Sequence, residues 1–447
     1  MHAIRDGAKR NHGDNGAADR AKPRVLVIAE AANPEWTSVP LIGWSLSTAL
    51  RRHADVLIVT QVRNRDAFLR QGLVEGTDFV AIDNEHVARR TNRLADVLRG
   101  GSGKGWTIVT AMEALAYYSF EQAVWRQFRG RLSAGEFDLV HRITPLSPTS
   151  QSLLARKLRR LGIPFVIGPL NGGLPWPKAF DGVRRKEREW LAPLRKAYQL
   201  MPAYKATRHD AAAIIAGSCH TLSELPTTLA DRAYLIPENG VDPARFQPRV
   251  RPLDSGPLRL AFVGRLVPYK GADILIEAAE AFCRNRQVEI LIIGDGPQRE
   301  ELEALVAARG LAAHVTFAGW VQHDALAARL AGCHCLALPS IREFGGGVVL
   351  EAMALGMVPV VARYGGPAEL IDPQSGIAVP FTDRQSLVDG FEAALAGLLA
   401  EPTRLEHLSR GAIARIASTF TWDAKAQQIL AIYNWTLKRA SKPSFAF

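Results

Sequence analysis

The sequence predicts an α/β protein made of two doubly wound, Rossmann-like domains that face each other across a cleft. Short apolar runs rich in β-branched residues recur along the chain, and helical patterns fill the intervals between them. The alternation then restarts after a segment rich in proline and arginine. Continuous apolar runs of this length are typical of strands buried in a parallel sheet, and strands alternating with helices are typical of doubly wound folds.

The predicted strands fall into two sets, and these sets define the domains. The first set covers 24–29, 56–60, 137–141, 164–168 and 212–216, with a helix over about 43–52. The second set covers 258–264, 290–294, 315–317, 335–338 and 358–361. We therefore expect a disordered tail (1–22), a first domain (23–242), a linker (243–257), a second domain (258–420) and a final segment (421–447) whose apolar helix packs back on the first domain. Ligands of such folds bind at the carboxyl ends of the strands.

Composition excludes several classes of protein. Hydrophobic residues make up 47% and charged residues 22% of the 447 residues, as in ordinary globular proteins. No apolar run reaches the ~18 residues of a membrane span, and the first 22 residues lack the apolar region of a secretory signal. The four cysteines are Cys219, Cys283, Cys333 and Cys335, and no second Cys/His pair at zinc spacing accompanies the last two. We expect Cys333 and Cys335 to be buried thiols in a strand, and we expect no metal and a cytoplasmic location.

The net charge of +11 is concentrated in the first half of the chain. Residues 1–250 contain 36 Lys and Arg against 24 Asp and Glu, a net charge of +12; the remainder contains 19 against 20, a net charge of −1. This asymmetry indicates an anionic partner for the first half, namely nucleic acid, a phosphorylated substrate or a membrane surface. A merely basic surface is the alternative.

The segment Arg342–Met353 carries the strongest chemical pattern. Glu343 and Glu351 stand eight positions apart, with Gly345, Gly346 and Gly347 between them and a predicted helix over 348–355. A glycine-rich turn before a helix exposes backbone N–H groups to an anion, and each carboxylate can accept hydrogen bonds from sugar hydroxyls. The alternative is an ordinary strand–loop–helix connection with a solvated glutamate.

A second pattern follows the predicted strand over 258–264. Gly264-Arg265 and Lys270-Gly271 place two cations in a short loop, and such a pair can neutralise a diphosphate, although both could be solvated loop charges. Gly294-Asp295-Gly296-Pro297 lacks the third glycine of a dinucleotide-binding turn, so we interpret it as structural. His141 ends a predicted strand of the first domain and can face the cleft, although a single histidine is more often structural.

Together these segments make a family resemblance plain. In order, they are Asn239-Gly240-Val241-Asp242 with Phe246, Val263–Leu266 with Lys270-Gly271, Gly294–Pro297, Leu338-Pro339-Ser340, Glu343 to Glu351, Gly365–Glu369, and Phe420, Trp422 and Tyr433. About 200 residues of the second half resemble the family 4 glycosyltransferases, which have the GT-B fold. The first half matches only in general outline.

The resemblance implies a retaining hexosyltransferase that needs neither metal nor cofactor and uses a UDP- or GDP-linked sugar. It implies that Arg265 and Lys270 bind the donor diphosphate, that Glu351 binds the ribose, and that Glu343 binds the transferred sugar. The backbone from Gly345 to Val348 would line the same pocket, beside Gly264, and His141 would contact the sugar near its reacting carbon. The chain contains no D-x-D sequence, which a metal-dependent transferase of the other major fold would have.

Two departures from the family pattern concern the sugar and the acceptor. Phe344 precedes Gly345, where the family has glycine followed by an aromatic residue, and the glycine pair after the first strand is reduced to Ile42-Gly43-Trp44. The acceptor is expected to be a saccharide or a lipid-linked molecule of polysaccharide or glycolipid biosynthesis. The segment 168–177, rich in glycine and proline, is either a wall of the cleft or a plain connector.

A basic segment over 183–208 interleaves Arg and Lys with Trp190, Tyr198, Leu200 and Tyr204. Such a segment can lie on an anionic membrane, and a core-facing helix with a solvated basic face is the alternative. Nucleic-acid binding is disfavoured because no recognition motif accompanies the basic residues. A non-catalytic sugar-nucleotide-binding protein and a sugar-nucleotide epimerase remain as alternative functions.

Overall fold

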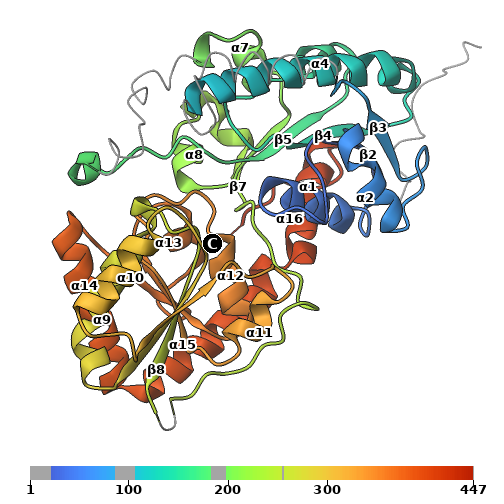
Figure 1. Ribbon diagram of the computed structural model, residues 1–447. Helices are drawn as coiled ribbons and strands as arrows, with labels where there is room; N and C mark the ends of the chain where they lie inside the picture. The colour runs from blue at the N-terminus through green and yellow to red at the C-terminus, as the bar shows by residue number, and fades with distance from the viewer. Residues whose placement is uncertain (1–21, 86–105, 183–197, 254–255, 446–447) are drawn as a thin grey trace, which may run out of the picture.

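The protein consists of two parallel sheets with helices on both faces of each, arranged as two domains (Figure 1). The computed structural model describes residues 22–85, 106–182, 198–253 and 256–445. The first sheet has seven strands in the order β3-β2-β1-β4-β5-β6-β7, and the second has six in the order β10-β9-β8-β11-β12-β13. The predicted class is therefore confirmed. The expected disordered tail lies outside the described residues, except for its last position.

The strands of the first sheet are β1 (Arg24–Ala29), β2 (Asp55–Gln61), β3 (Phe79–Ile82), β4 (Leu139–Thr144), β5 (Phe165–Leu170), β6 (Ala213–Ala216) and β7 (Ala233–Leu235). The main helices are α1 (Val39–Leu50), α2 (Arg65–Arg70), α4 (Trp106–Ser133), α5 (Leu154–Arg160), α7 (Tyr204–His209) and α8 (Cys219–Ser223). One face of the sheet packs against α4 and α5, and the other packs against α1. Both faces are buried, as the continuous apolar runs predict.

The strands of the second sheet are β8 (Leu258–Val263), β9 (Val288–Ile293), β10 (Val315–Gly319), β11 (Cys335–Leu338), β12 (Val358–Ala362) and β13 (Ile377–Val379). Its helices are α9 (Ala272–Arg284), α10 (Arg299–Ala308), α11 (Leu326–Leu330), α12 (Gly347–Ala354), α13 (Gly366–Leu370), α14 (Arg384–Ala400) and α15 (Pro402–Arg415). The strand order reverses between β8 and β11. Their carboxyl ends therefore form the point where such sheets bind ligands.

The final helix, α16 (Trp422–Thr436), packs on the first domain beside α1 (Figure 1). Its residues Ile429, Ile432 and Tyr433 are fully buried in the first-domain core. The returning chain pairs with the outgoing one at the domain boundary, because Val241 N donates to Phe420 O (2.9 Å) and Trp422 N donates to Val241 O (3.2 Å). The two segments of the chain that pass between the domains thus lie side by side.

Two further sequence expectations concern cysteines and membrane helices. All four cysteines are free thiols, and only Cys219 is exposed. Within the described part of the chain, no helix combines the length and the apolar character that crossing a bilayer requires.

The docking of α16 predicts a large effect of Ile432→Ala on stability. Removing a fully buried aliphatic side chain of this size costs about 2–5 kcal/mol in the free energy of unfolding. The matched control is Gln427→Ala on the exposed side of the same helix, for which we expect a change within about 0.5 kcal/mol. Urea unfolding measures both, and equal transition midpoints for the two variants would contradict the docking.

Candidate donor-binding site

The candidate site lies where β8 and β11 end. The loop after β8 carries Lys270, the loop after β11 carries Glu343, and the two side chains form an ion pair. The loops also approach each other through their backbones: Ile341 N donates to Tyr269 O (2.9 Å), and a Cβ at Gly271 would stand 2.7 Å from Pro339 O. The side chains of Lys270 and Glu343 are 16% and 21% exposed, so both remain accessible to a ligand.

The glycine-rich turn leads from Glu343 into α12. Gly346 is the residue before the helix and has φ of 67°, a conformation that favours glycine. Gly347 begins the helix, and the first backbone N–H groups of a helix have no carbonyl partner one turn earlier. A Cβ at Gly345 would stand 2.3 Å from Glu238 Oε1, so close packing against Glu238 requires a glycine at position 345 as well. The glycine-rich turn and the start of the helix predicted from the sequence are both present, and a helix N-terminus of this kind favours an anion.

Glu351 lies in the second turn of α12 and is held by His323. His323 Nε2 is 2.6 Å from Glu351 Oε1, and His323 Nδ1 is 3.1 Å from an Arg245 guanidinium nitrogen. Because arginine only donates, Nδ1 accepts, and Nε2 carries the proton that it donates to Glu351. His323 thus fixes one carboxylate oxygen of Glu351. Sequence reasoning missed His323, because a histidine in a loop 28 positions away gives no local signal.

Arg265 is exposed in the loop after β8, and no ion pair or side-chain hydrogen bond engages it among the described residues. The loop itself is tightly held, because Leu266 N donates to Asp295 O (2.9 Å) and a Cβ at Gly294 would stand 1.9 Å from Gly264 O. The turn at Gly294 therefore has the structural role predicted for it. Arg265 is free to meet an anion beside Lys270.

His141 does not face the cleft, which corrects the sequence expectation. The imidazole is 0% exposed; Nε2 lies 2.7 Å from Gly168 O and Nδ1 lies 2.6 Å from the Tyr433 hydroxyl. The reason is the strand boundary: β4 continues to Thr144, so His141 lies inside the strand and points to the α1 and α16 side. It ties α16 to the first sheet, and its buried imidazole is not accessible to a sugar.

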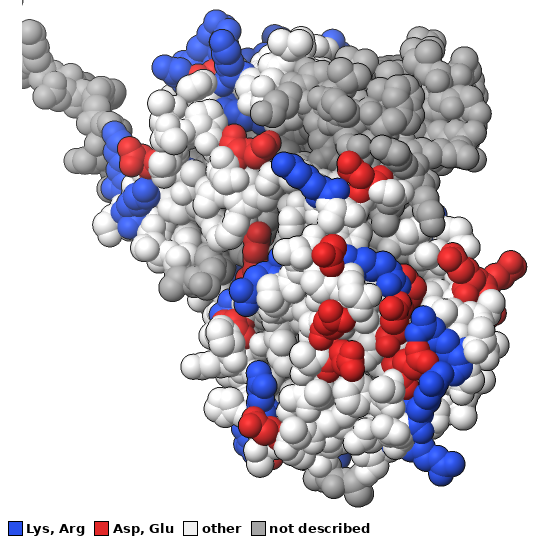
Figure 2. Space-filling model, turned by 90° about the vertical axis from the view of Figure 1, so that its left-hand side faces the viewer, with Lys and Arg blue, Asp and Glu red and all other residues white. Residues whose placement is uncertain are grey.

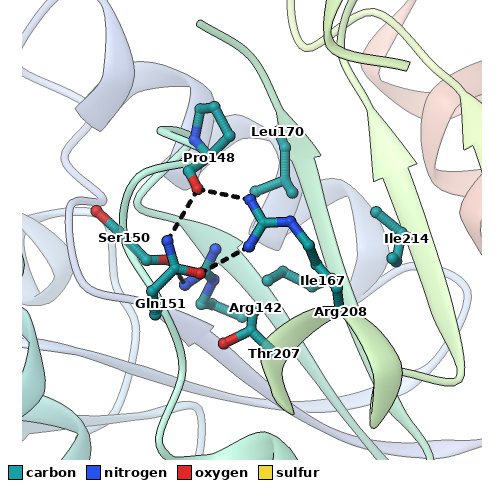
Figure 3. Close-up of a pocket in the computed structure, with 9 residues that line it drawn as sticks. All are labelled: Arg142, Pro148, Ser150, Gln151, Ile167, Leu170, Thr207, Arg208 and Ile214. Carbon is teal, nitrogen blue, oxygen red and sulfur yellow. Dashed lines mark hydrogen bonds between the residues drawn. The ribbon is translucent and has the colours of Figure 1, made fainter. Parts of the chain in front are cut away.

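A small cavity lies in the first domain (Figure 3). It is lined by Arg142 and Arg208; Arg208 donates to Gln151 Oε1 (2.8 Å) and to Pro148 O (3.0 Å). Its volume of about 10 Å³ holds about one water molecule. It is therefore not a site for a sugar or a nucleotide, and its arginines hold the loop that follows β4.

A loop of the first domain reaches the second domain beside this site. Trp176, which follows β5, is 9% exposed and belongs to the core of the second domain. Asn171 donates one hydrogen bond to Glu238 Oε1 (2.7 Å) and one to Phe344 O (3.1 Å). The loop, predicted as a wall of the cleft or a plain connector, therefore contacts the second domain directly beside Glu343.

Glu238 is a buried carboxyl group at the boundary between the domains, and sequence reasoning missed it. Burial raises the pKa of Glu238 to about 7, and burial also lowers the pKa of the nearby Lys425 to about 7. Lys425 Nζ donates to Pro237 O (2.6 Å). The only sequence signal was an acidic residue directly before Asn239 in an otherwise apolar stretch.

Comparison with known proteins supports the assignment of the second domain. Residues 244–410 match the family model described as glycosyl transferases group 1. The chain is 34% identical over 183 residues to an alpha-D-kanosaminyltransferase of Streptomyces kanamyceticus, covering 40% of this chain and 46% of that protein. It is 27% identical over 314 residues to an MMP alpha-(1->4)-mannosyltransferase of Mycolicibacterium hassiacum, covering 69% and 72%. The match spans about half the length of the first curated relatives.

Solved structures share the whole fold. A sucrose-phosphate synthase from Thermosynechococcus elongatus superposes with a TM-score of 0.59 at 19% identity, covering 94% of this chain and 100% of that one. Anabaena HepE in complex with UDP and glucose gives 0.56 at 18% identity, covering 91% and 98%.

The buried environment of His141 predicts that it stays neutral in mild acid. Burial lowers the pKa of His141 from 6.5 to about 4. Below pH 6.5, His141 binds a proton in the unfolded chain and stays neutral in the folded chain. The free energy of unfolding therefore falls between pH 6.5 and 4, by up to about 3 kcal/mol. NMR titration of the imidazole tests this. A titration midpoint near 6.5 would contradict the buried placement.

The geometry of the β8–β11 edge, the matched family model and the shared architecture agree with one another, and we conclude that the second domain is a group 1 glycosyltransferase domain within a GT-B fold.

Proposed function

We propose that the protein is a retaining, metal-independent hexosyltransferase that uses a nucleotide-diphosphate sugar. The observation that carries this proposal is the convergence of Lys270, Glu343 and the turn before α12 at the carboxyl ends of β8 and β11. A cation, a carboxylate and free backbone N–H groups at one point match the diphosphate and the sugar hydroxyls of such a donor. The family match of this domain supports the same class of enzyme.

Each residue has a role in this proposal. Lys270 and the exposed Arg265 bind the diphosphate and stabilise the negative charge that develops on it when the bond to the sugar breaks. Glu351 accepts hydrogen bonds from the ribose through the oxygen that His323 leaves available. Glu343 accepts hydrogen bonds from the sugar. The acceptor hydroxyl attacks the same face of the sugar that the diphosphate leaves, and its proton passes to the departing phosphate oxygen.

The relatives support the nucleotide-sugar class of donor. The solved HepE complexes contain UDP, UDP with glucose, and UDP-glucose, and the curated relatives include a mannosyltransferase and a glycogen synthase. For this chain we propose a UDP- or GDP-linked hexose as donor and a saccharide or lipid-linked acceptor of cell-surface polysaccharide or glycolipid biosynthesis. Transfer of the sugar distinguishes this activity from donor isomerisation by an epimerase and from binding alone by a sensor.

The donor site predicts a specific loss of binding in Glu351→Ala. Calorimetry with UDP-, GDP- and ADP-sugars in the presence of EDTA should find one donor that binds the wild type. Because a hydrogen bond to a charged group contributes about 1.5–3 kcal/mol, we expect affinity to fall roughly 10- to 100-fold in the variant. The control is Glu301→Ala, an exposed residue of α10 outside the site. Binding that survives Glu351→Ala unchanged would remove Glu351 from the donor site.

We also propose that the first domain docks on an anionic cytoplasmic membrane surface to reach a lipid-linked acceptor. Most of the predicted basic segment (183–197) lies outside the described residues. Within the described part, Leu200 is 89% exposed and precedes the exposed Lys205. An exposed aliphatic side chain with an exposed lysine five positions further along the chain suits an anionic lipid surface. On the face shown in Figure 2, the second domain presents acidic and basic side chains intermixed.

Co-sedimentation with liposomes tests the docking. The wild type should bind vesicles that contain anionic lipid and not neutral ones, and Leu200→Ser should weaken this binding several-fold. The matched control is Trp320→Ser, which removes a 67% exposed aromatic side chain from the second domain. Equal binding to both kinds of vesicle, or to neither, would contradict the proposal.

A further inference from the structure

The loop that follows β5 contacts the residues on both sides of Glu343. We call residues 171–176 the β5 arm. Arg342, which precedes Glu343, places its guanidinium 4.9 Å from the ring centre of Trp176 and donates from Nε to Leu174 O (3.1 Å). Phe344, which follows Glu343, accepts a hydrogen bond from Asn171 Nδ2 (3.1 Å) at its backbone oxygen. The first domain therefore holds both sequence neighbours of a carboxylate that belongs to the second domain.

The same arm contacts the other half of the ion pair. The ring of Trp176 meets that of Tyr269 edge-on, with ring centres 6.0 Å apart and planes at 89°. Tyr269 directly precedes Lys270, and its backbone oxygen accepts from Ile341 N. One aromatic side chain of the first domain thus packs between the two loops that carry Lys270 and Glu343.

The amide of Asn171 is oriented by its surroundings. Its Oδ1 accepts from the Ser218 hydroxyl (2.9 Å), and its Nδ2 donates to Glu238 Oε1 (2.7 Å). Exchanging the oxygen and the nitrogen would place the amide oxygen against Glu238 Oε1 and the backbone oxygen of Phe344, which are both acceptors. The second Nδ2 hydrogen is therefore available for Phe344 O, and the contact has a defined direction.

We propose that the β5 arm is a positioning element for Glu343, so that recognition of the donor sugar depends on a contact supplied by the first domain. The inference rests on the proposed function. Loops bind ligands precisely only when neighbouring groups fix their backbone and rotamers. The segment 342–344 follows β11 as a loop, and the arm fixes it on both sides. The arm does not touch the sugar in this proposal, and it acts through Arg342 and Phe344.

The alternative is that the arm only joins the two domains. Phe180 supplies the matched control, because it follows the arm, is 4% exposed and packs edge-on against Phe381 of the second domain with ring centres 5.7 Å apart. Its loss removes an interdomain aromatic contact of similar kind. It removes none of the contacts described here to Arg342, Phe344 or Tyr269.

The experiment compares the affinities of the donor sugar nucleotide and of its nucleoside diphosphate alone. The ratio of the two affinities measures how much the sugar contributes to binding, and in this proposal the contact with Glu343 provides part of that contribution. We expect Trp176→Ala and Asn171→Ala to reduce the ratio about tenfold, Trp176→Phe to restore most of it, and Phe180→Ala to leave it unchanged. An unchanged ratio in the arm variants, or an equal reduction in Phe180→Ala, would overturn the proposal.

A second measurement does not depend on the donor. Amide hydrogen exchange of residues 341–347 should be faster in Trp176→Ala and Asn171→Ala than in the wild type and in Phe180→Ala. If the wild type binds no sugar nucleotide, the proposed function fails, and the exchange data still decide whether the arm fixes this loop. Equal exchange in all four proteins would overturn the positioning role even if donor binding is found.

Discussion

The ion pair between Lys270 and Glu343 is the contact on which the candidate site depends. It forms because β8 and β11 are neighbours in the sheet, although Lys270 and Glu343 are 73 positions apart in the chain. Each strand ends in a loop, and the close approach of Gly271 to Pro339 brings the loops together. Both side chains of the pair are partly exposed, so the pair is open to a ligand. A bound diphosphate would contact Lys270 while Lys270 stays paired with Glu343. A bound sugar would donate a hydrogen bond to Glu343 while Glu343 stays paired with Lys270.

Contacts from neighbouring loops hold the residues around this pair in place. The turn at Gly294 supports the loop that carries Arg265, and Gly366 N donates to Glu343 O (3.1 Å) from the start of α13. His323 holds Glu351 from the loop before α11, and its other nitrogen contacts Arg245 close to the crossing between the domains. The first domain completes the arrangement through the β5 arm. The site is therefore assembled from both domains, although its charged groups come from one.

Much of this could be predicted from the sequence, and the failures have identifiable causes. Long apolar runs such as β8 and β9 are continuous, so their strands were placed correctly; β7 and β13 are only three residues long and give too short a signal. Glu343, the glycines and Glu351 are close in sequence and lie on one turn and the helix that follows it, so their order on these elements follows from local structure. The sequence misplaces His141 because the predicted strand ends at residue 141, whereas β4 continues to Thr144. His323, Asn171, Glu238 and Trp176 act through contacts between distant segments, and no local pattern encodes such contacts.

The measurement that tests the central claim most directly is a crystal structure of the protein with a bound nucleotide sugar. The account predicts the diphosphate within hydrogen-bond distance of Lys270 and Arg265, a ribose hydroxyl on Glu351 and a hydroxyl of the sugar on Glu343. A donor bound away from the ends of β8 and β11, or a diphosphate that leaves the Lys270–Glu343 pair untouched, would contradict it.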